Sequence, residues 1–362
     1  MTLRLLTVPT LTSLGEPGGW MYEGMRRVMS ARMIDMYGHD DCSMTAEQRM
    51  VDQAMGTDFD KHRVVAVDGA DDPDNVVGFG WADLPLTANP TMAFINAEVR
   101  PDRRGQGIGA ELAQWAETTA AEHGRTSWMV GAPFASAQPG QATVTAEQGD
   151  AVPASTPGLV FALARGYTLR QVERWSRLDL PVAEEKLARF HDEALAHSQG
   201  YRIHRWLGTP PEQWLGKLGA LTTAMSTDPP FGGLTLDEDP WDADRLRQGC
   251  ARLQAMGYEH LTVAVEHISS AALVAYTDME PRSGTPWAEQ SDTIVHRDHR
   301  GHRLGMLIKV ANLRWLAERH PQVNRIYTWN ASENTHMLAI NLALGFYPVG
   351  GEASLQKGDE ST

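Results

Sequence analysis

The 362-residue sequence contains little cysteine: it has only Cys42 and Cys250, which lie far apart in the chain. Two distant cysteines give neither a disulfide framework nor the paired spacing of a zinc site, and we expect a reducing compartment. Three histidines at a spacing of three, His296, His299 and His302, lack a fourth ligand of obvious type, so we predict no metal there. The sequence also lacks a signal-peptide pattern and the run of roughly 18 apolar residues that a membrane-spanning helix needs. These absences predict a cytoplasmic protein with no membrane partner and no metal.

Positive charge is also scarce. The 32 Lys and Arg residues are outnumbered by 46 Asp and Glu residues, which gives a formal net charge of −14. A nucleic-acid-binding protein neutralises phosphates with a basic face, so we expect no nucleic-acid partner. An acidic surface attracts a cationic ligand such as an amine. The alternative is that the negative charge only keeps the protein soluble.

The sequence does contain a repeated pattern. Residues 95–133 and 291–331 each read as an apolar strand, an arginine-rich turn with glycines, an amphipathic helix and a second strand. Each copy then closes with a helix that ends at a glycine before an aromatic residue, FALARGY in the first copy and INLALGF in the second. We therefore predict an α/β fold (α+β in some schemes) that occurs twice, each copy a twisted mixed sheet flanked by helices.

The domain boundaries follow from this repeat. We predict an N-terminal domain at 1–180, a linker helix at 181–199 and a C-terminal domain at 200–362. The first copy is longer than the second because of residues 134–157, which are rich in Ala, Pro, Gly, Thr and Gln and show no apolar period. This composition predicts an inserted surface loop.

The turn Arg104–Gly109 contains three glycines and stands between a strand and a helix. A helix N-terminus leaves backbone N–H groups without partners and carries partial positive charge, and glycine lets the backbone approach a ligand closely. Such a turn suits a diphosphate. It lacks the Lys-Ser/Thr end of a Walker loop and the acidic ribose partner of a dinucleotide fold. The alternative interpretation is a helix start with exposed arginines and no ligand. The repetition of the whole pattern argues against this alternative.

On these motifs the chain resembles the GNAT (GCN5-related) N-acetyltransferases. Arg104, Gly107 and Gly109 match the family pattern Arg/Gln-x-x-Gly-x-Gly/Ala. The segments HRGHRLG and TWNA-x-x-N of the second copy resemble a group of tandem actinobacterial acetyltransferases, and mycothiol synthase is a more distant tandem relative. The resemblance covers most of the chain, with each copy spanning a whole fold.

The resemblance implies an N-acetyltransferase that uses acetyl-CoA as co-substrate, requires no metal and acetylates a primary amine of a small molecule. Transfer would be direct, within a ternary complex. The alternative is an acyl-CoA-binding scaffold or sensor in which one or both domains are catalytically silent. A different acyl donor and homo-oligomerisation both stay open.

The resemblance also implies two cofactor sites. In the family, acetyl-CoA inserts between two splayed strands, the first strand pairs with the pantetheine arm, and the amides of the turn hold the pyrophosphate. The corresponding residues are Val99, Arg104, Gly105, Gln106, Gly107, Ile108, Gly109 and Ala110 in the first copy and Val295, Arg300, Gly301, His302, Arg303, Leu304, Gly305 and Asn334 in the second. Because Arg303 stands at the position of Gly107, we expect the first copy to be the stronger site.

Catalysis requires a general base, because an alkylammonium with a pKa near 10 is not nucleophilic at neutral pH. The family uses carboxylates on the strand before the turn, which implies Glu98 in the first copy and Asp292 in the second. The alternative for each residue is a solvated carboxylate on a strand, without a catalytic role. We favour Asp292, because the second copy keeps Asn334 and has no long insertion beside its cleft. The tyrosine that many members use as general acid is replaced by Ala162 and Asn341, so we name no acid.

Overall fold

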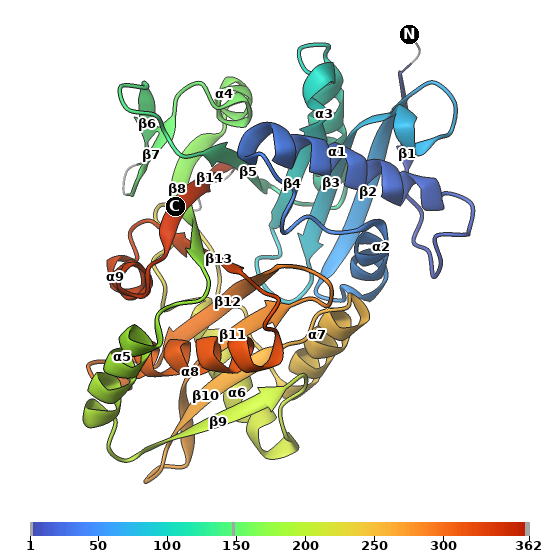
Figure 1. Ribbon diagram of the computed structural model, residues 1–362. Helices are drawn as coiled ribbons and strands as arrows, with labels where there is room; N and C mark the ends of the chain where they lie inside the picture. The colour runs from blue at the N-terminus through green and yellow to red at the C-terminus, as the bar shows by residue number, and fades with distance from the viewer. Residues whose placement is uncertain (1–2, 147–148, 359–362) are drawn as a thin grey trace. The chain divides into compact units, whose positions relative to one another are not determined.

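The structure is a computed structural model that describes residues 3–146 and 149–358 (Figure 1). These residues divide into two compact units. Unit 1 lies within the bounds Met1–Glu147, Ala151–Gln171 and Glu352–Thr362, and unit 2 lies within Gln148–Asp150 and Val172–Gly351. Each unit contains strands of a mixed sheet covered by helices, so the predicted fold class is confirmed.

Unit 1 is built on five strands in sequence order, followed by the C-terminal part of β14. Neighbours pair antiparallel from β1 to β4, and β4 pairs parallel with β5. The strands are β1 (Leu3–Thr7), β2 (Phe59–Asp68), β3 (Val76–Pro85), β4 (Met92–Val99), β5 (Ser127–Ala135) and β14 (Tyr347–Gly358). The helices are α1 (Gly19–Tyr37), α2 (Ala46–Met55), α3 (Ile108–Glu122) and α4 (Pro157–Ala164), with short 3₁₀ turns η1 (Pro73–Asn75) and η2 (Pro101–Arg103).

Helices cover both faces of this sheet, and the sequence of β2 reflects it. Val65 and Val67 pack in the same core as α1, whereas Val64 and Ala66 pack in the core that contains residues of α3. Successive residues of a strand point to opposite faces, so a strand covered on both sides becomes a continuous apolar run. The sheet therefore positions α1 and α3 on opposite sides of β4.

Unit 2 repeats this pairing scheme. Strands β9 to β12 pair antiparallel, β12 pairs parallel with β13, and β13 pairs antiparallel with β8. The strands are β9 (Tyr201–Leu207), β10 (Leu261–His267), β11 (Ala272–Pro281), β12 (Trp287–Val295), β13 (Arg325–Ala331) and β8 (Thr168–Asp179). The helices are α5 (Glu184–His197), α6 (Glu212–Met225), α7 (Ala243–Ala255), α8 (Leu304–Arg319) and α9 (Thr335–Leu344), with the 3₁₀ turn η3 (Arg297–His299). No helix in the described part of the chain is long and apolar enough to cross a membrane.

The division into units differs from the boundaries expected at 1–180, 181–199 and 200–362. Most of β8 belongs to unit 2, where Glu173–Asp179 pair with β13, and the C-terminal residues from Glu352 belong to unit 1. The expected linker helix is α5, which packs against α8 and places Leu187 in a core of unit 2. Apolar periodicity identifies a strand or helix, but it does not say which sheet a strand joins.

The expected insertion at 134–157 contains regular structure. Its first residues complete β5, and β6 (Thr143–Thr145) and β7 (Ala151–Pro153) form a separate two-stranded antiparallel ribbon. Val152 is fully buried. The segment thus adds no further strand to the main sheet, but it is more ordered than its composition predicts; residues 147 and 148 lie outside the described residues.

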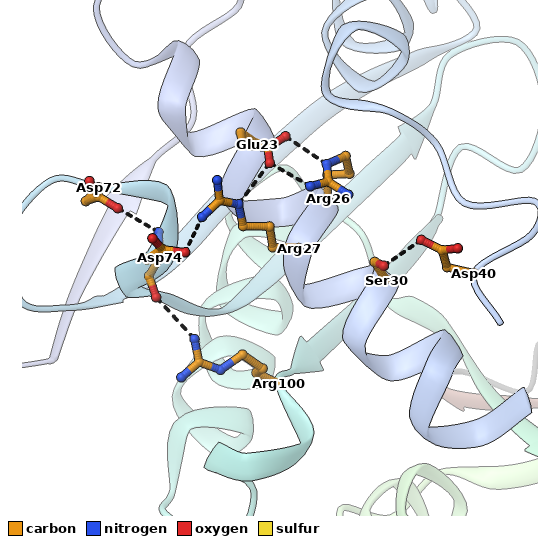
Figure 2. A network of polar contacts seen from close by, with 8 residues as sticks. All are labelled: Glu23, Arg26, Arg27, Ser30, Asp40, Asp72, Asp74 and Arg100. Carbon is orange, nitrogen blue, oxygen red and sulfur yellow. Dashed lines mark hydrogen bonds and ion pairs between the residues drawn. The ribbon is translucent and has the colours of Figure 1, made fainter. Parts of the chain in front are cut away.

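Polar contacts tie α1 to the chain just before the glycine turn (Figure 2). Glu23 accepts hydrogen bonds from Arg26 and Arg27, and Arg27 also pairs with Asp74 of η1. The backbone carbonyl of Asp74 accepts a hydrogen bond of 3.1 Å from Arg100, the residue before η2. This network holds one end of the turn beside α1.

Candidate active site

The parallel strands β4 and β5 pair only over a short stretch. Met92–Phe94 pair with Ser127–Met129, and both strands continue beyond that point without further pairing between them in the described residues. The side-chain amide of Asn96 spans the gap, because its Nδ2 donates a hydrogen bond of 2.8 Å to the carbonyl of Gly131. The two strands therefore diverge and leave a slot in the sheet of unit 1.

A cavity of about 440 Å³ opens at this slot. It is bounded by α1, β4, the glycine turn, the start of α3, β5 and the start of α4. The lining residues are Arg32, Met36, Asn96, Ala97, Glu98, Val99, Arg103, Arg104, Gly105, Gly107, Gly109, Ala110, Gly131, Pro133, Pro157, Gly158 and Phe161. The cavity thus joins the turn expected to bind pyrophosphate with the carboxylate expected to act as a base.

The glycine turn presents backbone N–H groups at a helix N-terminus. Gly105 and Gly107 have φ of +74° and +86°, and a Cβ on either would meet no atom within 4 Å. Gly107 is the N-cap of α3 and provides no side-chain cap. The N–H of Ala110 already donates to Gly107 O at 2.9 Å, whereas the N–H groups of 105–109 make no hydrogen bond within the described residues. Free N–H groups beside the positive end of a helix are suited to an anion.

The arginines of this turn are paired with carboxylates of unit 1. Arg103 donates to Asp68 at 2.7 Å, and Arg104 donates to Asp35 at 3.0 Å. The Arg104–Asp35 pair lies at the surface with its two side chains 35% and 48% exposed, and surface pairs contribute only about 0–1 kcal/mol. Arg104 can therefore exchange Asp35 for a phosphate group at little cost.

Glu98 lies in the wall of the cavity, next to a buried arginine. Both Glu98 and Arg32 have side chains that are only 12% exposed, and Arg32 Nε lies 3.4 Å from Glu98 Oε1. Burial raises the pKa of Glu98, while the charges of Arg32, Arg104 and Arg49 act in the opposite direction. A carboxylate whose pKa is raised toward the working pH is a more effective general base.

Unit 2 contains a cavity of about 380 Å³ at the corresponding slot. There β12 and β13 pair from Trp287–Arg325 to Gln290–Thr328, and both strands again continue beyond the paired stretch. The lining residues are Met225, Asp228, Pro229, Pro230, Thr293, Ile294, Val295, Arg300, Gly305, Glu333, Asn334, Thr335, His336, Met337 and Ile340.

The second turn differs from the first at its N-cap. Arg303 has φ +55° and ψ +19°, a left-handed conformation that is unfavourable by roughly 1–2 kcal/mol for a residue other than glycine. Its side chain does not line the cavity but donates to Glu193 of α5 at 2.7 Å. The position that corresponds to Gly107 is therefore occupied by a residue that carries a side chain.

A buried carboxylate also holds the arginines of the second turn. Asp228 is 5% exposed and accepts from Arg297 at 2.7 Å and from Arg300 at 2.9 Å. Arg300 Nε donates in addition to the carbonyl of Val295 at 3.2 Å. A phosphate approaching this turn would have to replace a carboxylate that is far less exposed than Asp35 of unit 1.

Asp292 is oriented differently from Glu98. It does not line the second cavity, and its Oδ2 accepts a hydrogen bond of 2.8 Å from Tyr276. Burial, followed by the nearby charge of Asp278, raises the pKa of Asp292 to about 6. In the repeat Asp292 corresponds to Asn96, so the two expected bases occupy different positions on their strands.

The expected cofactor residues separate into two groups. Val99, Arg104, Gly105, Gly107, Gly109, Ala110, Val295, Arg300, Gly305 and Asn334 line the two cavities, whereas Gln106, Ile108, Gly301, His302, Arg303 and Leu304 do not. Ile108 and Leu304 are buried in cores. Asn334 also caps α9, because its side chain accepts from the N–H of Met337 at 3.2 Å.

The polar residues Arg32, Asn96 and Asp228 line these cavities and were not expected from the sequence. Asn96 could have been found, because it aligns with Asp292 in the repeat. Arg32 and Asp228 come from a helix and a loop that reach the turns only in the folded chain, and no local pattern marks them.

Comparison with known proteins gives a family match for part of the chain and similar folds for nearly all of it. Residues 27–138 match the family model of the acetyltransferase (GNAT) family. The structure is similar to a tandem GNAT protein from the clavulanic acid biosynthesis pathway, with a TM-score of 0.72 and 24% identity over 99% of this chain and 98% of that chain. It is also similar to a GCN5-related N-acetyltransferase from Sphaerobacter thermophilus, with a TM-score of 0.61 and 14% identity over 98% and 95% of the two chains. No curated protein sequence matches the chain.

The two units share an α/β architecture in which a cavity opens beside the turn that precedes a helix. The match to the GNAT acetyltransferase family lies within unit 1, and the solved tandem GNAT protein shares the fold of nearly the whole chain. Family and fold together support an acyltransferase activity.

Proposed function

We propose that unit 1 binds acetyl-CoA in its slot and transfers the acetyl group directly to a primary amine of a small molecule. One observation carries this proposal: a single cavity is lined by the glycine turn, by the diverging strands and by Glu98. The cofactor, the acyl group and a base therefore have neighbouring places in one unit.

In this proposal the backbone of the turn binds the cofactor. The N–H groups of the cavity-lining residues Gly105, Gly107 and Gly109 hold the pyrophosphate, and Arg104 adds a full positive charge. The N–H of Ala110 contributes less, because it already donates within the turn. The pantetheine arm extends along β4 near Val99, where β5 has diverged and leaves backbone groups to pair with it.

The chemistry requires two proton transfers and one acyl transfer. Glu98 accepts a proton from the ammonium group, and the free amine attacks the thioester carbon. The C–N bond forms, the C–S bond breaks with its electron pair going to sulfur, and the thiolate takes the second proton from nitrogen, so that CoA is released as the thiol. Ala162 stands at the position of the family's acidic tyrosine, and a thiolate is a fair leaving group without a dedicated acid.

The direct test is acetyl transfer from labelled acetyl-CoA to a panel of primary amines. The wild-type chain is expected to release one CoA for each labelled product, and the Glu98→Gln variant is expected to bind CoA but to turn over slowly. Binding of CoA without transfer to any amine would instead support an acyl-CoA-binding scaffold.

For unit 2 a catalytically silent site is the second candidate function. Three observations favour it: Asp228 engages the arginines of the turn, Arg303 replaces the glycine, and Asp292 bonds to Tyr276 away from the cavity. Calorimetry on the full chain tests this assignment. We expect one strong CoA site in the wild type, and we expect Asp228→Asn to strengthen a second, weaker site.

A further inference from the structure

A group of three possible metal ligands lies in unit 1, apart from the acyl cavity. Asp60 and His62 are alternate residues of β2, so they share one face of the strand, the face on which Val64 contacts α3. His123 follows directly after the last residue of α3. One ligand atom from each of the three side chains lies within 4.8 Å of the other two.

The His123 ring is held in the tautomer that a metal ligand requires. Its Nδ1 lies 2.8 Å from the carbonyl oxygen of Thr119. A carbonyl can only accept, so Nδ1 must carry the proton, and Nε2 keeps its lone pair. A ring N–H bonded to a backbone carbonyl is the arrangement that orients histidine ligands in metal sites.

His62 and Asp60 provide the other two donors. His62 Nε2 lies 3.0 Å from Asp60 Oδ2, yet this nitrogen makes no well-oriented hydrogen bond and is shielded from solvent. The rings of His62 and His123 are 4.6 Å apart and tilted by 48°. Ligands at about 2.0–2.1 Å around a tetrahedral ion lie roughly 3.3 Å from one another, close to the His62–Asp60 separation.

Neighbouring positive charges are matched elsewhere and do not compete for this carboxylate. Lys61 Nζ donates to Asp52 at 2.6 Å, and Arg63 pairs with Asp83. The Asp60 side chain is 48% exposed, so an ion can reach the group from solvent.

We propose that Asp60, His62 and His123 bind one divalent ion of the zinc type, with water completing its coordination. Two imidazoles and one carboxylate favour Zn²⁺, Co²⁺, Ni²⁺ or Cu²⁺ over Mg²⁺ and Ca²⁺, which take oxygen ligands. The ion joins β2 to the C-terminal end of α3, and the glycine turn lies at the other end of that helix. The site lies apart from the acyl cavity, so the proposal does not depend on the proposed acyl transfer.

The test uses the full chain without a histidine tag, stripped of metal with a chelator and titrated with Zn²⁺ against a chromophoric competitor at pH 7.5. His62→Ala and His123→Ala are compared with His191→Ala. His191 is a matched control, because it is 30% exposed beside Asp192, much as His62 is 28% exposed beside Asp60, but it has no third ligand among the described residues. Comparing variants removes any contribution from the other histidines of the chain, which has 13 in all.

We expect both ligand variants to lose one bound ion, with at least a tenfold weaker affinity, and the control to bind as the wild type does. Zn²⁺ should raise the melting temperature of the wild type and the control only, because a ligand of the native state stabilises it. Equal Zn²⁺ affinity in all four proteins would overturn the proposal. If His62→Ala fails to fold, the comparison of His123→Ala with the control tests the proposal, because His123 is exposed.

Discussion

Glu98 combines burial with neighbouring arginines, and this environment determines how the rate should depend on pH. Replacing Glu98 by Gln removes the base but keeps the size of the side chain, so turnover should fall by about 10²–10⁴-fold while CoA affinity is nearly unchanged. In the wild type, kcat should fall as pH decreases through the pKa of Glu98, which burial raises above the ordinary value. Steady-state kinetics across pH, with calorimetry for CoA, measures both effects.

The Asp292→Asn variant tests the other expected base and is compared with Glu98→Gln. Burial raises the pKa of Asp292 to about 6, so a rate that depended on it would rise through that pH. Because its carboxylate bonds to Tyr276 outside the cavity, we expect less than a tenfold loss from this change. If neither Glu98→Gln nor Asp292→Asn lowers the rate tenfold, both assignments of the base are wrong.

The sequence shows some of these residues better than others. Gly105, Gly107 and Glu98 could be predicted, because the strand, the turn and the helix that position them are consecutive in the chain. The pairing of Arg32 with Glu98 and of Asp228 with Arg300 could not, because each brings together segments that are distant in sequence. No local pattern records such contacts.

Within unit 2, helix α8 carries a buried lysine. Lys309 is 1% exposed, and its Nζ donates to Gln290 at 2.6 Å. Burial lowers the pKa of Lys309 to about 7, whereas in the unfolded chain it is about 10.4. Between these values the unfolded chain holds a proton that the folded chain lacks, so the free energy of unfolding increases as pH rises through this window.

Lys309→Met should remove that contribution. One proton corresponds to about 1.4 kcal/mol per pH unit, so from pH 7 to pH 9 the wild type should gain roughly 2–3 kcal/mol more stability than the variant. Urea denaturation at several pH values measures the difference. Parallel curves for the two proteins would show that Lys309 does not titrate in this window.

The individual helices and strands were easier to predict from the sequence than the segments with which they pair or pack. The helices and strands around both turns follow from apolar periodicity, and α3 and α8 begin directly after the glycine-rich segments. The ribbon β6–β7 was missed, because a segment rich in Ala, Pro and Gly gives no alternation from which a short strand can be recognised.

At the scale of the whole molecule, unit 1 contains residues from both ends of the chain. Leu355 of β14 is fully buried and belongs to the same unit as the glycine turn. Leu355→Ala should therefore destabilise unit 1 by about 2–5 kcal/mol, through lost burial and the cavity left behind. Leu342 is 72% exposed, and Leu342→Ala should change stability by no more than about 0.5 kcal/mol.

Chemical denaturation of the two leucine variants decides this point. Equal stability would show that the C-terminal residues add nothing to the core of unit 1. The same division explains why the expected boundary near residue 180 differs from the compact units: neither unit is a continuous segment of the sequence. Cofactor binding is therefore best measured on the full chain.

The central claim is that the turn of unit 1 binds CoA through its backbone, and a pair of glycine variants tests it most directly. Gly107 and Gly124 lie at the two ends of α3, both have positive φ, and a Cβ on either would meet no atom within 4 Å. Valine at either position introduces a similar backbone strain, but only at Gly107 would it crowd the pyrophosphate. Calorimetric titration of the full chain with CoA should give a Kd at least tenfold higher for Gly107→Val and an unchanged Kd for Gly124→Val. Equal affinity in both variants would contradict the account, because the pyrophosphate would then lie elsewhere.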